Sequence, residues 1–394
     1  MEANAQELRL GDAGSHRLSF FAAALGVIAI SAAICNGASP NQDTTGPVWP
    51  TKEWQTSSPE EEGMDSKQLA NVVDFGTTHG FESLLIVRHG KIVAEAGYAP
   101  YYHAGIANRV YSVTKSVIST LMAIACKDGL LDSTNHRVLD FFDRSSIANI
   151  DERKKAITVQ NLLDMTSGID WTEHFAPPSS DMEMASSVDW VKFVLDRPMS
   201  SVPGEIFNYN SGNPHLLSAI LTKLTGMNAL EYAKTKLFGP LGITDVNWDD
   251  DAKGNSNGGW GLYLQPRDMA KIGYLYLRKG VWAGKQLLPP DWVNKVSHAT
   301  VETHLKQGFR YSNLFWALPD KPVYMAVGRY GQVIMIFPDL DIVVVTTGHK
   351  EYPLNEFAES IYRSAKLDTS LPADPVGAKV LADKILEIST VRPH

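Results

Sequence analysis

The segment Tyr111-Ser112-Val113-Thr114-Lys115-Ser116 runs directly into an apolar stretch of sequence. The apolar residues recur every three or four positions, which predicts a helix over 112–127 with Ser112 on its first turn (Val113, Val117, Leu121 and Ile124). Three residues make nearly one helical turn, so we expect the Lys115 ammonium beside the Ser112 hydroxyl. A serine hydroxyl is a poor nucleophile until a neighbour takes its proton, and a buried lysine with a lowered pKa can do so.

The helix start strengthens this interpretation, because a helix N-terminus carries partial positive charge where negative charge would build up on a substrate oxygen. The alternative is an exposed helix start in which Ser112 is a plain cap. A chain of this length offers about one or two Ser-x-x-Lys spacings by chance, so the motif needs partners elsewhere in the sequence.

Composition places the chain among ordinary globular proteins. It has 394 residues, 44% hydrophobic and 20% charged, which allows one large domain or two subdomains. The net charge of -8 and the lack of a basic cluster argue against nucleic-acid binding. The zinc-protease motif, the Gly-x-Ser-x-Gly motif and Gly-rich phosphate loops are absent from the sequence, and we expect neither a metal nor an organic cofactor. The two cysteines, Cys35 and Cys126, imply no disulfide framework, and Cys126 is expected to be a small core residue.

The N-terminal segment reads as a targeting signal. Residues 18–35 are uncharged and mostly apolar, and His16 and Arg17 precede them. This pattern resembles a secretory signal or a short membrane anchor, with cleavage near Ala38 favoured over a lipoprotein site at Cys35. We therefore assign residues 1–45 to a signal peptide or membrane anchor plus linker and expect export to the periplasm or medium, with anchoring in a membrane as the alternative.

Three blocks of pattern follow this segment. The first predicts a helix over 65–78 and a hairpin with strands 83–88 and 92–96. The second is mostly helical, and its expected helices are 112–127, 158–166, 187–196, 212–225, 228–238, 266–279 and 289–297. The third predicts strands 314–318, 323–327, 332–337 and 342–346, a helix over 354–366, and a short peripheral helix over 380–388.

Strands at both ends with helices between them predict an α+β fold. We expect one antiparallel sheet flanked by helices, with an all-helical subdomain (about 116–300) inserted between the two groups of strands. The domain would span 46–368, and residues 369–394 would form a C-terminal tail. Ser112 then lies at the junction of sheet and insertion, where such a layout leaves a cleft.

Four further segments make a family resemblance specific. They are Ile157–Gly168, Pro203–Gly212, Gly261–Lys271 and Gly328–Gln332. Together with the Tyr-Ser-Val-Thr-Lys-Ser segment, their order and spacing over about 55–365 resemble the class C β-lactamase and penicillin-binding-protein superfamily. Within it, the chain is most similar to the branch with family VIII carboxylesterases and 6-aminohexanoate-dimer hydrolases. The resemblance implies a β-lactamase/transpeptidase-like fold.

The resemblance gives Tyr209 the second catalytic role, since a Tyr-x-Asn element of the family faces the serine and its tyrosine shares a proton with the lysine. A nearby cation also favours phenolate, which lowers the phenol pKa from about 10. Either phenolate or neutral Lys115 could then take the Ser112 proton, and the sequence leaves both open. The element ends in Ser211 where β-lactamases keep an asparagine that helps to hold a substrate amide, which weakens a β-lactamase function.

The resemblance also suggests an oxyanion hole made by the backbone N–H groups of Ser112 and Gln332. Arg329-Tyr330-Gly331 stands where β-lactamases carry Lys-Thr-Gly on the strand that lines the cleft. Gly331 would let the substrate lie against that strand, and Tyr330 would narrow the pocket.

The neighbouring candidates are less specific. Arg329 either meets a substrate carboxylate or is a solvated arginine at the strand edge. Trp171, with Glu173 and His174 after it, either lines the cleft or caps the core.

These observations predict a serine hydrolase that forms an acyl-enzyme on Ser112, with Lys115 and Tyr209 as the general base. The substrate would be a small-molecule ester or amide, and a carboxylesterase is favoured because ester leaving groups depart more easily than amines. The alternatives are an amidase of the 6-aminohexanoate-dimer hydrolase type, a β-lactamase or D,D-peptidase, and a non-catalytic binding relative. The sequence leaves the oligomeric state open.

Overall fold

A computed structural model describes residues 49–173, 178–305 and 307–390 of the chain. The predicted signal or anchor within 1–45, and His174, lie outside these residues. No helix in the described ranges is long and apolar enough to cross a membrane.

The centre of the fold is a nine-stranded sheet with the order β1-β3-β2-β14-β13-β12-β11-β10-β9. The strands are β1 (Gln55–Thr56), β2 (Phe81–Arg88), β3 (Lys91–Gly97), β9 (Val301–Glu302), β10 (Arg310–Ser312), β11 (Phe315–Ala317), β12 (Tyr324–Gly328), β13 (Gln332–Phe337) and β14 (Ile342–Gly348). Every neighbouring pair is antiparallel except β1 and β3, which are parallel. Because β2 pairs with β14, the two ends of the described chain meet in the middle of the sheet.

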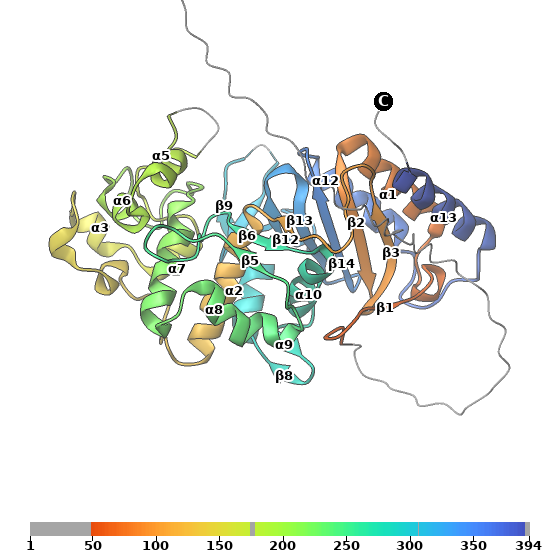
Figure 1. The fold of residues 1–394 in the computed structure, drawn as a ribbon, viewed down its shortest axis with the longest axis horizontal. Coiled ribbons are helices and arrows are strands. Elements are labelled where there is room, and N and C mark those ends of the chain that lie inside the picture. The colour runs from red at the N-terminus through yellow and green to blue at the C-terminus, as the bar shows by residue number, and fades with distance from the viewer. Residues whose placement is uncertain (1–48, 174–177, 306, 391–394) are drawn as a thin grey trace, which may run out of the picture. The chain divides into compact units, whose positions relative to one another are not determined.

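Both faces of this sheet are buried. Along β14, Val343 and Val345 face one core while Ile342 and Val344 face the other, as the two-residue period of a strand requires. The first core includes α2 (Val113–Lys127) and α10 (Pro266–Leu277); the second includes α1 (Ser66–His79), α12 (Leu354–Ser364) and α13 (Pro375–Thr390) (Figure 1).

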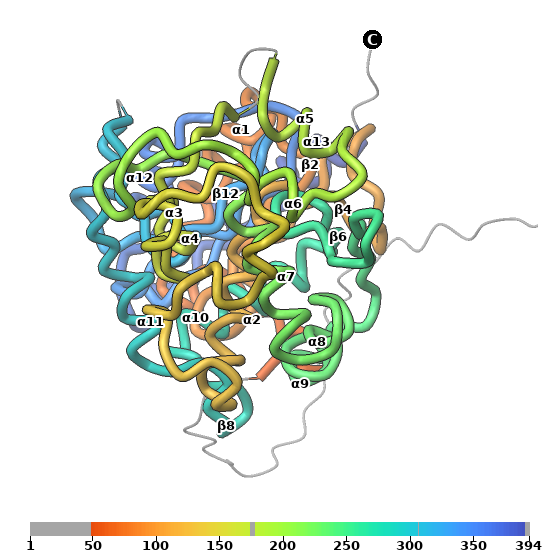
Figure 2. The backbone as a smooth tube through the Cα atoms, turned by 90° about the vertical axis from the view of Figure 1, so that its left-hand side faces the viewer, coloured from red at the N-terminus to blue at the C-terminus, as the bar shows by residue number. Residues whose placement is uncertain are grey.

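The middle of the chain forms a helical region on the α2 side. It contains α3 (Glu152–Ala156), α4 (Val159–Leu163), α5 (Ser180–Ser186), α6 (Trp190–Asp196), α7 (Gly212–Thr225), α8 (Ala229–Ala233), α9 (Gly239–Leu241) and α11 (Pro290–Ser297). Short strands accompany these helices, namely β4 (Asn108–Arg109), β5 (Asn247–Trp248) and β6 (Leu262–Leu264) in one sheet and β7 (Val281–Trp282) and β8 (Lys285–Gln286) in another. Figure 2 faces this region and shows α7 beside α2.

Helix α2 is buried along almost its whole length, from Val113 to Ala125. Its buried polar side chains have partners, as burial requires. The Ser116 hydroxyl donates to the Leu314 carbonyl at 2.7 Å, and Thr120 donates to the Ser116 carbonyl at 2.7 Å. Packing and hydrogen bonds therefore hold the helix that follows Ser112 in the core.

The predicted fold class is confirmed, and the long elements agree closely with their predicted ranges. Helix α4 ends at Leu163, before the predicted 166, and Met165 just beyond it has a φ of 57°. The segment predicted as a tail carries α13, which is longer than the helix expected over 380–388 and buries Leu381 and Ile388 in the core next to α1. Cys126 is half-buried against the core, as expected.

Candidate active site

Ser112 and Lys115 meet at the start of α2. The chain turns into the helix at Tyr111, whose φ of 45° is uncommon for a bulky residue. One turn further on, Lys115 Nζ lies 2.9 Å from Ser112 Oγ and 2.8 Å from the carbonyl oxygen of Gly259. The Lys115 side chain is only 1% exposed, so the predicted contact exists and is shielded from water.

The environment of Lys115 makes its amine easier to deprotonate. Burial disfavours the charged form and lowers the pKa of Lys115 to about 8, although the negative charges of Glu173 and Asp181 oppose this change. At pH 7 about one amine in ten is then neutral. Lys115 can therefore act as a proton acceptor near physiological pH.

Tyr209 lies on the other side of the same amine. It precedes α7, and Lys115 Nζ lies 4.9 Å from the centre of its ring. Burial raises the pKa of Tyr209, and a hydrogen bond with the side chain of Ser112 opposes the rise. The three residues predicted to act together are thus in one place. Burial raises the phenol pKa, contrary to the expectation that it is lowered, and Lys115 and Tyr209 both stay candidates for the base.

Ser211, at the position where β-lactamases keep an asparagine, lines a cavity at Ser112 and is bonded to Glu173. Its hydroxyl and backbone N–H donate to the two carboxylate oxygens of Glu173, the N–H at 3.0 Å. The Trp171 indole also donates to Glu173, at 2.6 Å. Glu173 is only 8% exposed, so three donors hold a buried carboxylate at the edge of the site.

These contacts bear on two of the residues named from the sequence. Of the two positions left open for Trp171, the structure shows the one in the core, where its side chain is buried and its indole donates to Glu173. The sequence singled out Glu173 only as a possible lining residue. Its position shortly after Thr166-Ser167-Gly168 was the signal for it, and its contact with Ser211 was not predicted.

The loop from Asp249 to Gly261 supplies the carbonyl that holds Lys115, and sequence reasoning missed it. Asn257 Oδ1 accepts hydrogen bonds from the backbone N–H groups of Gly259 at 2.9 Å and Trp260 at 3.2 Å. Gly258 permits a close approach to α7, because a Cβ there would lie 2.1 Å from the Pro214 carbonyl oxygen. The Asn-Gly-Gly-Trp run at 257–260 is the only sequence signal for this arrangement.

The end of β12 lies directly against Ser112. A Cβ on Gly328 would stand 3.2 Å from the backbone nitrogen of Ser112, so the strand passes close to the start of α2. Gln332 pairs with Gly328 across the β12–β13 hairpin, and its side chain donates to the Gly348 carbonyl at 2.7 Å. The predicted oxyanion donors are the backbone N–H groups of Ser112 and Gln332. Gly328 lies next to both residues, so the structure brings the two residues close together.

Arg329, Tyr330 and Gly331 form a tight turn between β12 and β13, in the gap between the predicted strands 323–327 and 332–337. Tyr330 has a φ of 64° and Gly331 a φ of 79°, which explains the glycine. A Cβ on Gly331 would lie 3.0 Å from the Lys350 carbonyl oxygen and 3.1 Å from the Tyr352 ring, and the contact of Gly331 with substrate stays a prediction.

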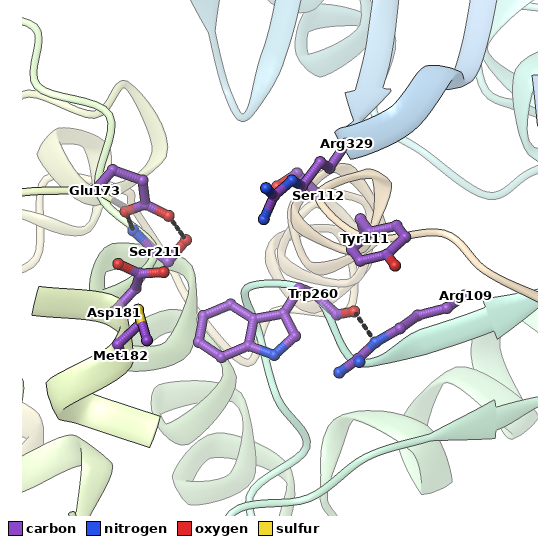
Figure 3. Close-up of a pocket in the computed structure, with 9 residues that line it drawn as sticks. All are labelled: Arg109, Tyr111, Ser112, Glu173, Asp181, Met182, Ser211, Trp260 and Arg329. Atoms are coloured by element: carbon purple, nitrogen blue, oxygen red, sulfur yellow. Dashed lines mark hydrogen bonds between the residues drawn. The ribbon is translucent and has the colours of Figure 1, made fainter. Parts of the chain in front are cut away.

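Two cavities meet at Ser112. One has a volume of about 460 Å³, and its lining residues are Arg109, Tyr111, Ser112, Glu173, Asp181, Met182, Ser211, Trp260 and Arg329. The other has a volume of about 410 Å³, and its lining residues are Ser112, Glu173, Phe207, Tyr209, Leu305, Trp316, Val327, Gly328, Arg329, Tyr330 and Glu351. Figure 3 shows the first cavity, with Glu173, Ser211, Asp181 and Met182 on one wall and Ser112 and Arg329 opposite.

Among the described residues, no group of three or more His, Cys, Asp or Glu side chains is arranged to hold a metal ion.

Comparison with known proteins decides the family. A model of the β-lactamase family matches residues 60–368. The chain belongs to the β-lactamase family. The resemblance drawn from the sequence motifs is confirmed, and the protein is a member of the serine hydrolases with the β-lactamase fold.

Members of this family with known names resemble the chain over most of its length. It is 24% identical to the 6-aminohexanoate-dimer hydrolase of Paenarthrobacter ureafaciens over 323 residues, 75% of this chain and 79% of the relative. A Bacillus anthracis structure assigned provisionally to the same hydrolases superposes with a TM-score of 0.66 at 17% identity, covering 88% of this chain and 90% of that one. EstCE1, a hydrolase with promiscuous acyltransferase activity, superposes with a TM-score of 0.64 at 17% identity, covering 77% and 98%. At these identities the solved structures establish the fold.

Proposed function

We propose that the protein is a carboxylesterase that cleaves small-molecule esters through an acyl-enzyme on Ser112. The observation that carries the proposal is the buried Lys115 amine 2.9 Å from a Ser112 hydroxyl that lines two cavities. A base in contact with a nucleophile, and a nucleophile in contact with space for substrate, are the geometric requirements of covalent catalysis.

Acylation begins with neutral Lys115 as the base. The amine takes the Ser112 proton, Oγ bonds to the carbonyl carbon, and the backbone N–H groups of Ser112 and Gln332 stabilise the oxyanion. The C–O bond to the leaving group then breaks. Tyr209, with its raised pKa, is a protonated phenol that delivers a proton to the departing oxygen and is reprotonated by the Lys115 ammonium.

Deacylation repeats these steps with water in place of the alcohol. Neutral Lys115 takes a proton from the water and the new C–O bond forms. Tyr209 then gives a proton to Ser112 Oγ as the acid leaves and is reprotonated by the Lys115 ammonium. Acylation and deacylation together consume one ester and one water and release one alcohol and one acid.

Amide hydrolysis is the second candidate. It is favoured by the similarity to a 6-aminohexanoate-dimer hydrolase over three quarters of the chain. Action on β-lactams is disfavoured, since Ser211 is committed to Glu173 and the bulky Tyr330 lines the site.

The test is a burst experiment with p-nitrophenyl acetate and butyrate, combined with fluorophosphonate labelling. We expect a burst equal to the enzyme concentration and a label on Ser112. The matched control is Ser116→Ala, which removes a hydroxyl from the same helix that faces the Leu314 carbonyl, and which should keep burst and label. A folded protein with no burst and no label would support the non-catalytic alternative, and nitrocefin turnover at the ester rate would support a β-lactamase.

A further inference from the structure

The two cavities at Ser112 differ in chemistry. The aromatic cavity, which we define as the one lined by Phe207, Tyr209, Leu305, Trp316, Val327 and Tyr330, is walled mainly by rings and aliphatic groups, and the charged residues Glu173, Arg329 and Glu351 complete its lining. Trp316 stacks on Tyr209 with ring centres 5.6 Å apart, and Phe207 meets the Trp316 ring edge-on at 5.9 Å. These contacts make a preformed apolar wall beside the serine.

The polar cavity, which we define as the one lined by Arg109, Asp181, Met182, Ser211 and Trp260, has charged groups on two sides. Arg109 is paired with Asp249 at 3.1 Å and donates to the Trp260 carbonyl at 3.4 Å. Asp181 is 7% exposed on the opposite wall. Among the described residues, Ser112, Glu173 and Arg329 line both cavities. A substrate carbonyl attacked by Ser112 therefore has one cavity available to its acyl group and the other to its leaving group.

The position of Tyr209 indicates which of the two cavities receives the leaving group of the substrate. A general acid must come within hydrogen-bonding reach of the atom that it protonates, and in acylation that atom is the leaving oxygen. Tyr209 lines the aromatic cavity and is absent from the walls of the polar cavity. The group attached to the leaving oxygen therefore extends along the Tyr209 side.

We infer that the aromatic cavity binds an apolar leaving group, an aryl or extended alkyl alcohol, and that the acyl group occupies the polar cavity. The inference rests on the proposed esterase function. In acylation the Ser112 Oγ–C bond forms, the C–O bond to this alcohol breaks, and the alcohol leaves with the proton that Ser112 gave up through Lys115 and Tyr209.

Two exposed apolar side chains allow a matched test, because each lines one cavity. Leu305, 44% exposed, lines the aromatic cavity, and Met182, 56% exposed, lines the polar cavity. Neither is part of a buried core, so Leu305→Ala and Met182→Ala should both fold.

The experiment compares two series of esters. Ethyl to hexyl acetates vary the leaving group at nearly constant leaving-group pKa, and p-nitrophenyl acetate to octanoate vary the acyl group. In the wild type we expect kcat/KM to rise by up to about fourfold per methylene along the alkyl acetates. Leu305→Ala should lose about three- to tenfold on the longest acetates. It should leave the hydrolysis rate of the acetyl-enzyme unchanged, since the alcohol has departed by then.

Met182→Ala should instead alter selectivity along the acyl series and the rate of acyl-enzyme hydrolysis. The inference is overturned if Leu305→Ala changes acyl-chain selectivity or deacylation, or if the acetate series is flat in the wild type. Failure of the esterase function itself would look different: the wild type would not turn over p-nitrophenyl acetate at all.

Discussion

The Gly259 carbonyl oxygen lies 2.8 Å from Lys115 Nζ and holds one of its N–H groups. With that bond made and the amine neutral, the lone pair of Lys115 is free to face Ser112 Oγ at 2.9 Å. A loop from the helical region thus orients the Lys115 amine on α2. The contact is made by the backbone oxygen of Gly259, which no side-chain substitution removes.

The pH dependence of activity should report the Lys115 amine. Because burial lowers its pKa to about 8 and the neutral form is the base, kcat/KM for p-nitrophenyl butyrate should increase as pH rises through about 8. The apparent value belongs to the coupled group of Lys115, Tyr209 and Ser112. A rate that is constant from pH 6 to 9 would show that another group controls the reaction.

Glu173→Gln should move this acid limb to lower pH. The Glu173 charge favours the Lys115 ammonium, so neutralising it makes the amine easier to deprotonate, while Asp181 still opposes the shift. Trp171→Phe is the control, because it removes one hydrogen bond to Glu173 and keeps the charge. A limb that stays in place in Glu173→Gln, or moves to higher pH, would contradict the electrostatic account.

Gly258→Ala should disrupt the support of Lys115. The added Cβ would meet the Pro214 carbonyl oxygen at 2.1 Å, so the loop must shift and draw the Gly259 carbonyl away. We expect kcat to fall about tenfold or more. Gly254→Ala, in the same loop with nothing within 4 Å of its Cβ, should cost about 1 kcal/mol in stability through its positive φ and leave kcat within twofold. Equal kcat values for the two variants would exclude the loop as a positioning element.

The same loop is anchored by a buried pair, His215 and Asp251, with Nε2 and Oδ2 3.0 Å apart. Despite the burial that raises it, hydrogen bonds from His215 and Asn255 lower the pKa of Asp251 to about 2. The pair's stabilisation is therefore present above about pH 4, the unfolded pKa, and is lost as pH falls towards 2. Asp251→Asn should reduce the unfolding free energy by about 2 to 4 kcal/mol at pH 7.

Urea unfolding at several pH values measures this effect. The gap between wild type and Asp251→Asn should close as pH falls from about 4 to about 2. Asp249→Asn breaks only the half-exposed pair with Arg109 and should change stability by about 1 kcal/mol or less. A gap that is independent of pH would mean that the Asp251 charge contributes nothing.

The elements that the sequence predicted best are those with strong local patterns. Helix α7 runs over the predicted 212–225, and β13 over the predicted 332–337, because apolar periodicity and Gly residues mark their ends. The contact between Ser112 and Lys115 was predicted from their spacing of about one helical turn. The placement of Tyr209 beside them was predicted from the family resemblance.

What the sequence did not predict depends on contacts between distant segments. The Gly259 carbonyl reaches Lys115 across 144 positions of sequence, and no residue type marks a backbone oxygen as functional. The Glu173 carboxylate meets Ser211 across 38 positions, and the turn at Arg329–Gly331 is set by left-handed backbone at Tyr330, which is unusual for a tyrosine. Local pattern carries no information on such pairings.

Steady-state turnover of p-nitrophenyl esters by Ser112→Ala measures whether Ser112 is the nucleophile. With the fold checked by thermal unfolding, the variant should lose activity by about a thousandfold or more, since removal of a nucleophile leaves only binding and oxyanion stabilisation. Turnover by folded Ser112→Ala within about tenfold of the wild type would contradict the account.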